Sequence, residues 1–210
     1  MNHDTPFSND PSGTQEKIMR ATHRALKKYG YAGLSLQKIA DEADLSKSSV
    51  YHFFDDKEDL LVAFLDYMLD HFRVQIEIGR SEDPDAAILE FLEVAITGSP
   101  PEGTNDFDTP EDVPLFGPIV ELRAQAVSNE EYRERFSRFD DLVVEELSRT
   151  IQRGVRQGVF RDVDPERMAN TILSIVMGSM FRHPTVDGYD GTPVFEEVEN
   201  MLSEYLLQAP

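Results

Sequence analysis

The chain has 210 residues, of which 40% are hydrophobic, and this composition excludes a disordered protein. It has no cysteine, which excludes disulfides, thiolate metal sites and cysteine nucleophiles. No apolar run approaches the roughly 18–20 residues of a membrane helix, and the first fifteen residues lack the basic and apolar regions of a signal peptide. We therefore expect a cytoplasmic protein.

The net charge of −20 is distributed unevenly along the chain. Residues 14–60 contain eight acidic and eight basic residues, whereas residues 61–210 contain 30 acidic and 12 basic ones, and all six lysines lie between positions 17 and 57. An acidic, lysine-poor body predicts a halophilic host, because in molar salt the screening length falls to about 3 Å and self-repulsion matters little. The alternative is an acidic bacterial protein that works in ordinary salt.

The first part of the chain has the pattern of short helices followed by a long one. Apolar residues recur with the helical period from residue 14, and Gly30 and Gly33 mark a break. Ser35 and Ser46 each occupy an expected N-cap position, with hydrophobic residues at the staple positions on either side. After a polar, flexible arm over 1–13, the predicted helices cover residues 14–29, 36–43, 47–54 and 57–79.

The remainder continues with helical periodicity and without strand-like alternation, so the fold is predicted to be all-α. Residues 98–114, rich in Pro, Gly and acid, form the longest irregular stretch, and Asp164-Pro165 is a helix start. The predicted body helices cover residues 85–97, 115–127, 129–157, 165–182 and 194–207. We therefore expect a three-helix helix-turn-helix head over 14–60, joined by a long helix to a helical-bundle body over 61–210.

Residues 33–60 support the prediction of function. The second short helix, 47–54, suits the DNA major groove, which admits one helix at a time. Val50, with Phe53 or Phe54, would hold its buried face. Its exposed face would offer side chains that can donate hydrogen bonds to phosphates or base edges, namely Lys47, Ser48, Ser49, Tyr51 and His52.

The same stretch resembles the DNA-binding signature of the TetR family of transcriptional regulators. The matching segments are Gly33-Leu34-Ser35, Ile39-Ala40-Asp41-Glu42-Ala43, Ser46–Ser49, Tyr51-His52-Phe53-Phe54 and Lys57-Glu58-Asp59-Leu60, with the family's spacing and no gaps. Asp44 replaces the usual glycine of the turn, and Ser48 replaces a frequent glycine in the recognition helix. Both departures bear on sequence preference.

The resemblance implies a sequence-specific regulator that binds double-stranded DNA, habitually a repressor released by a small molecule. The chain would form a homodimer, whose two recognition helices would lie about 34 Å apart on a palindromic operator. Beside the recognition helix, Ser35 and Gln37 would touch a phosphate or an adjacent base, and Lys57 would touch a phosphate. The predicted DNA contacts are Ser35, Gln37, Lys47, Ser48, Ser49, Tyr51, His52 and Lys57.

The resemblance also implies that the last long helices, matched here by residues 129–157 and 165–182, pair two subunits and that the body binds a ligand. The predicted interface residues are Met168, Ile172, Ile175, Val176 and Ser179, with Gly178 permitting close approach. The predicted pocket residues are Met68, Phe72, Phe91, Phe116, Arg123, Met177, Met180 and Phe181. Such apolar stripes are core more often than ligand lining, and Arg123 is either a polar anchor for a ligand or an ion-pair partner of Glu121 or a neighbour. The ligand itself is not identified.

An enzyme is not expected. The five histidines lack metal-binding spacing, and no nucleophile elbow, P-loop or dinucleotide fingerprint is present, so we predict no catalytic residue, metal or cofactor. The alternative function is a helical small-molecule-binding or protein-interaction module without DNA binding. In that case, neutralising Lys47 and Lys57 would change nothing in the cell.

Overall fold

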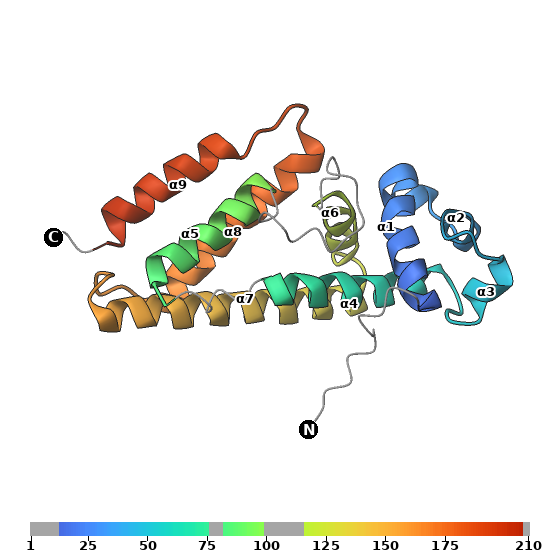
Figure 1. Cartoon of the computed structure of the whole chain (residues 1–210), viewed down its shortest axis with the longest axis horizontal. Helices are drawn as coiled ribbons and strands as arrows, with labels where there is room; N and C mark the ends of the chain where they lie inside the picture. Colours follow the sequence, from blue (N-terminus) through green and yellow to red (C-terminus); the bar gives the residue numbers. More distant parts are fainter. Residues whose placement is uncertain (1–12, 76–81, 99–115, 208–210) are drawn as a thin grey trace, which may run out of the picture.

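Helices make up most of the computed structural model, which describes residues 13–75, 82–98 and 116–207 (Figure 1). Within these ranges the chain forms no sheet, so the prediction of an all-α fold is confirmed, and no helix is long and apolar enough to cross a membrane. The helices are α1 (Thr14–Gly33), α2 (Leu36–Glu42), α3 (Lys47–Tyr51), α4 (Lys57–Gln75), α5 (Pro84–Thr97), α6 (Phe116–Gln125), α7 (Glu130–Gln157), α8 (Pro165–Thr185) and α9 (Thr192–Tyr205).

Local capping chemistry sets several helix starts where the sequence predicts them. The Ser35 hydroxyl accepts from the Lys38 amide at 3.3 Å at the start of α2. Asp164 caps α8 by accepting from two backbone amides at 3.1 Å, with Pro165 in the first turn. These caps satisfy amides that have no partner inside the helix, so they define the boundary independently of packing.

Several predicted helix ends differ from the structure: α1 runs to Gly33 and not to 29, α6 ends at Gln125 and not at 127, and α9 ends at Tyr205 and not at 207. The ends of α3 and α8 also differ. The recognition helix α3 ends at Tyr51, three residues early, because Phe54 turns into the core (5% exposed) while Phe53 stays 40% exposed. Helix α8 continues to Thr185 through Pro184, since proline in the last turn removes a single helical bond. Residues 1–12 of the predicted arm, the end of the long helix at 79 and nearly all of the irregular stretch 98–114 lie outside the described residues.

Two hydrophobic clusters form the core, and α7 contributes to both. One joins α1–α4, α6 and the first part of α7, and includes Leu26, Phe64 and Tyr132. The other joins α5, the second part of α7, α8 and α9. Figure 1 shows α4 beside the head end of α7, with α5, α8 and α9 at its other end. The head is therefore packed onto the body through shared core.

The turn between α7 and α8 is fixed by a close contact at a glycine. A Cβ on Gly154 would lie 2.1 Å from the ring of Phe160, which is fully buried. Phe160 also pairs with Leu207 in an isolated antiparallel bridge, and the Arg161 amide donates to the Leu206 carbonyl at 2.8 Å. The end of the described chain is thus tied to the start of α8.

His23 of α1 is a buried titratable side chain, only 3% exposed, with Phe64 6.5 Å away between ring centres. Burial, assisted by the positive charges of Lys27 and Arg24, lowers its pKa from 6.5 to about 4. The unfolded chain therefore binds a proton between these pH values that the folded chain does not. The contribution of His23 to the stability of the folded state is fully present above pH 6.5 and is lost as the pH falls toward 4.

We expect the free energy of unfolding to fall by about 2 kcal/mol between pH 7 and pH 5 from this group alone. His23→Leu should remove that part of the pH dependence, as measured by denaturant unfolding at each pH. His52→Ala, which alters an exposed histidine, is the matched control and should keep the wild-type slope. Equal slopes for His23→Leu and the wild type would contradict the assignment.

Candidate nucleic-acid interface

The recognition helix α3 is positioned by the side chain of Val50. Five residues are too few for a stable isolated helix, and Val50 is fully buried in the cluster formed by α1, α2 and α4. Phe54 is buried just after the helix. With this side inward, Lys47, Ser48 and Tyr51 lie exposed on the opposite side. The arrangement has the geometry of a helix presented to a groove.

The turn before α3 fixes its direction relative to α2. Asp44 has a φ of 51°, a left-handed conformation that favours glycine and that aspartate adopts more readily than most residues. The Leu45 amide donates to the Ala40 carbonyl at 2.9 Å and closes the turn. The substitution of the usual glycine therefore preserves the helix-turn-helix geometry.

Hydroxyl groups gather at the N-terminus of α3. The Ser46 hydroxyl accepts from the Ser49 amide at 3.1 Å and lies 2.8 Å from the hydroxyl oxygens of both Ser48 and Ser49. Lys47 lies over the Tyr51 ring at 5.3 Å, and within the described residues it forms no ion pair. The ammonium group of Lys47 is therefore available for a phosphate, and the hydroxyls can rotate toward one.

The other predicted DNA contacts have different surroundings. Ser35 is the cap of α2, and the exposed Gln37 donates to Asp41 at 2.7 Å. The exposed His52 ring packs edge-on against Phe53, with 5.3 Å between ring centres. Lys57 is half-buried and donates to the Tyr31 carbonyl at 3.2 Å.

A polar joint between head and body was missed by the sequence analysis. The Tyr31 hydroxyl donates to Glu58 at 2.8 Å, and Tyr132 of α7 donates to the other oxygen of Glu58 at 3.2 Å. Burial, followed by the hydrogen bond to Glu58, raises the pKa of Tyr31 to about 12. The Tyr31 amide donates to Glu121 of α6. No local pattern could have found this joint, because its hydrogen-bonded pairs lie 27 to 90 positions apart in the sequence.

Predicted pocket residues are brought together in part. Met68, Phe116, Met177 and Met180 lie in or against the cluster around α1, α4 and α6. Phe91 packs against the other cluster, Phe181 is 57% exposed, and the side chain of Phe72 lies outside the described residues.

Arg123 is an ion-pair residue whose partner is on α7, not the suggested Glu121. It donates two hydrogen bonds to Asp140, at 2.9 and 2.6 Å, and lies over the Phe136 ring at 4.5 Å. This two-point pairing engages both terminal nitrogens of the guanidinium group, whereas its buried Nε has no hydrogen-bond partner within the described residues.

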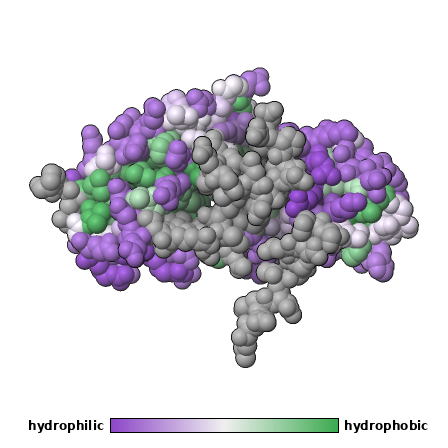
Figure 2. All heavy atoms as spheres, in the orientation of Figure 1, coloured by the Kyte–Doolittle hydropathy of each residue, from purple (hydrophilic) through white to green (hydrophobic). Residues whose placement is uncertain are grey.

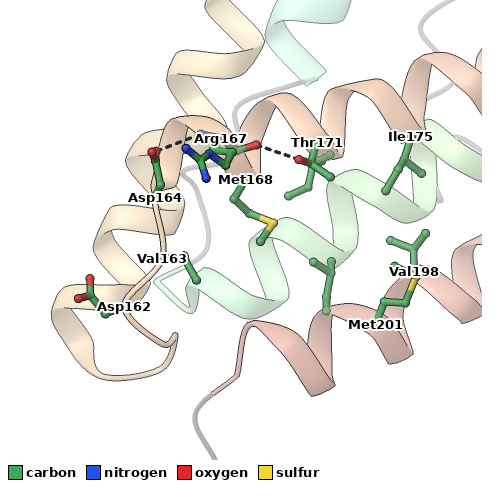
Figure 3. Close-up of a pocket in the computed structure, with 11 residues that line it drawn as sticks. Asp162, Val163, Asp164, Arg167, Met168, Thr171, Ile175, Val198 and Met201 are labelled. Atoms are coloured by element: carbon green, nitrogen blue, oxygen red, sulfur yellow. Dashed lines mark hydrogen bonds between the residues drawn. The ribbon is translucent and has the colours of Figure 1, made fainter.

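Predicted interface residues divide between interior and surface. Ile172, Val176 and Ser179 are buried within the single chain, whereas Met168 and Ile175 are half-buried. A cavity of about 510 Å³ opens between α8, α9 and the turn after α7 (Figure 3), and its lining includes Met168, Ile172, Ile175, Val198, Met201 and Leu202. Figure 2 shows apolar surface gathered over this end of the body.

The fold and the exposed face of α3 define a helix-turn-helix DNA-binding protein. The sequence profile of "Bacterial regulatory proteins, tetR family" matches residues 18–64, and that of "BetI-type transcriptional repressor, C-terminal" matches residues 115–208. The structure of a TetR transcription regulator from Haloarcula marismortui is 35% identical and has a TM-score of 0.76, with 93% of this chain and 98% of that chain covered. The chain belongs to the TetR family.

More distant relatives agree with this assignment. The HTH-type transcriptional regulator RutR of Escherichia coli K12 is 24% identical over 89% of this chain and 83% of its own. AibR, solved in complex with isovaleryl coenzyme A and operator DNA, shares the fold at 22% identity and a TM-score of 0.64, with 90% of this chain and 97% of that chain covered. The predictions of a DNA-binding transcriptional regulator and of a non-enzymatic protein are confirmed by the family.

The Ser46 cap, which fixes the start of α3, can be tested by its effect on stability. Ser46→Ala removes the acceptor for the Ser49 amide and should lower the free energy of unfolding by about 1 kcal/mol. Ser48→Ala, two positions along and without a capping role, should cost less. Denaturant unfolding of both variants measures the difference, and an equal effect would contradict the capping assignment.

Proposed function

We propose that this TetR-family regulator is a cytoplasmic repressor that a small molecule releases from a palindromic operator. The observation that supports its DNA contacts is the short helix α3, which is held by the buried Val50 and presents Lys47, Ser48 and Tyr51 to solvent. A helix with this exposure fits the major groove, where amine and hydroxyl donors meet phosphates and base edges.

In this proposal, Lys47, Ser48, Ser49 and His52 face the groove, and Tyr51 contacts phosphate. The other three predicted contacts, Ser35, Gln37 and Lys57, lie at the starts of α2 and α4 and would contact the DNA backbone on either side. Phosphate contacts fix the register of the protein, and the groove contacts supply sequence preference.

Regulators of this family bind DNA as homodimers, and we place the dimer interface on α8 and α9. The 510 Å³ cavity between these helices opens as a groove whose lining includes Met168, Ile175 and Met201 (Figure 3). The Met201 side chain is 55% exposed there. A Cβ on Gly178 would meet nothing within 4 Å, which leaves room for a second helix to approach. Ile172, Val176 and Ser179 support this surface from beneath.

The effector is proposed to act by shifting the arrangement of the two heads. Met68, Phe116, Met177 and Met180 form an apolar region between α4, α6 and α8, which favours a ligand with a substantial apolar part. Such a ligand must prefer one head arrangement by a few kcal/mol to release DNA. AibR offers a precedent, with an acyl coenzyme A and operator DNA bound to the same fold.

The acidic body is proposed to suit a halophilic cell. Thirty acidic against 12 basic residues in 61–210 would repel DNA at low salt. Molar salt screens this repulsion within a few ångströms, while contacts at α3 operate at short range. DNA binding should therefore persist in concentrated potassium chloride.

The DNA-binding proposal is tested by selecting fragments from the host genome with the purified protein in concentrated potassium chloride. We expect a palindromic site, and affinity for it should fall about tenfold or more in Lys47→Ala/Tyr51→Ala because phosphate and groove contacts are lost. Lys27→Ala, which removes an exposed lysine from α1, is the matched control.

Recovery of no site at any salt concentration would favour the helical binding module without DNA contact. Recovery of a site would direct the search for the effector, since compounds handled by the neighbouring genes can be tested for release of the duplex. A site that no such compound releases would contradict the sensing half of the proposal.

The dimer surface is tested by placing a charge in the groove. Met201→Glu should weaken dimerisation about tenfold or more, because a carboxylate would lose its water inside an apolar interface. Analytical ultracentrifugation measures the change. Val127→Glu, at a side chain 85% exposed in the turn between α6 and α7, is the control with the same chemistry. Equal dimerisation of the two variants would contradict the proposed surface.

A further inference from the structure

Tyr31 lies just after the kink at Gly30 and is held by charged side chains from two other helices. Its amide donates to Glu121 of α6, and its carbonyl accepts from the Lys57 ammonium at 3.2 Å. Its hydroxyl donates to Glu58 at 2.8 Å. We call these four residues, Tyr31, Lys57, Glu58 and Glu121, the Tyr31 socket. The socket therefore engages the amide, the carbonyl and the hydroxyl of Tyr31, which are all of its polar groups.

The contact between α6 and the head depends on the glycine beside it. Gly30 has a φ of 65°, and a Cβ there would lie 3.4 Å from a carboxylate oxygen of Glu121. With the helix kinked at Gly30, the Tyr31 amide donates to Glu121, and a hydrogen bond from an amide to a carboxylate is among the stronger ones. Glu121 therefore fixes where the end of α1 lies on α6.

Lys57 connects the socket to the DNA side of the head. Besides its bond to the Tyr31 carbonyl, its ammonium lies 4.3 Å above the centre of the Tyr31 ring. An ammonium group has three donors, so Lys57 can meet a phosphate while it holds Tyr31, or can exchange one for the other. In both cases, a DNA phosphate near Lys57 would change how strongly Lys57 holds Tyr31, the residue that also donates to Glu121 of α6.

We propose that Glu121 is a positioning residue for operator binding: through Tyr31 it sets the angle of the head on the body, so that a shift of α6 reaches the recognition helix. The inference rests on the DNA-binding function. The Glu58 bridge to Tyr132 holds the other side of Tyr31 against α7, so that α6 and α7 grip it from two directions. Because coupling between sites is reciprocal, operator binding should in turn steady α6.

The absence of cysteine from the chain allows a direct measurement of head orientation. Spin labels at Lys27→Cys on α1 and Arg138→Cys on α7, both exposed positions, report a distance within one chain when labelled protein is mixed with excess unlabelled protein. Glu121→Ala should broaden this distance distribution, and the matched control Glu90→Ala, at an exposed residue of α5, should not. Glu121→Gln keeps an acceptor oxygen and should stay closer to the wild type.

Operator affinity of Glu121→Ala should fall about tenfold, within the usual range of coupling between sites. A wild-type distance distribution in Glu121→Ala would overturn the proposal, whatever the DNA result. Failure of the wild-type protein to bind DNA would instead count against the function on which the proposal rests, because the distance measurement needs no DNA.

A measurement on the wild-type protein decides the question if Glu121→Ala does not fold. Hydrogen exchange in peptides from residues 116–125 should slow about fivefold when a duplex of about 30 base pairs, selected from random sequence, is bound. Unchanged exchange in α6 under saturating duplex would overturn the coupling. Slower exchange there would support it, since α6 carries none of the proposed DNA contacts.

Discussion

A helix of five residues has too few internal hydrogen bonds to stay folded by itself, and the head is arranged around this constraint. The core of α1, α2 and α4 receives Val50, so the direction of α3 is determined by packing and not by helix propensity. The turn at Asp44 and the cap at Ser46 then leave little rotational freedom. The position of α3 in a DNA groove therefore depends on the rigidity of this core, which also includes residues of α6 and α7.

The sequence predicted what is decided locally and missed what is decided by distant partners. Caps such as Ser35 and Asp164 act within three residues, so their patterns were sufficient to place helix starts. Arg123 was left with two interpretations because Asp140, its partner, is 17 positions away on another helix. The signature residues of the recognition helix were readable because they lie within one short stretch of sequence, and their proposed partner, DNA, lies outside the protein. The socket at Tyr31 was not, since it joins three helices that only the fold brings together.

The ion pairs that charged residues form in the structure are more informative than the number of charges in the sequence. Residues 14–60 are neutral by count, yet several charges there are already engaged: Arg20 pairs with Glu16 at 3.0 Å and Lys28 with Glu42 at 2.7 Å. Lys47, on the recognition helix, forms no such pair within the described residues. Internal pairing of this kind lets an acidic protein present positive charge at one place. It does not remove the negative charge of residues 61–210, whose repulsion of a polyanion is screened only in concentrated salt.

The bridge between Phe160 and Leu207 has a consequence for the order in which the chain is completed during synthesis. The head consists of residues translated early, and its short-range contacts can form as soon as α4 and its neighbours have been made. The turn that begins α8 is different, because the backbone of Phe160 and Arg161 and the Arg161 side chain find partners only about 46 positions downstream. A nascent chain can thus have a nearly folded helix-turn-helix head while the bridge between Phe160 and Leu207 has not yet formed. Chains halted before residue 206 would then lack the closed end on which α8 and α9 are arranged.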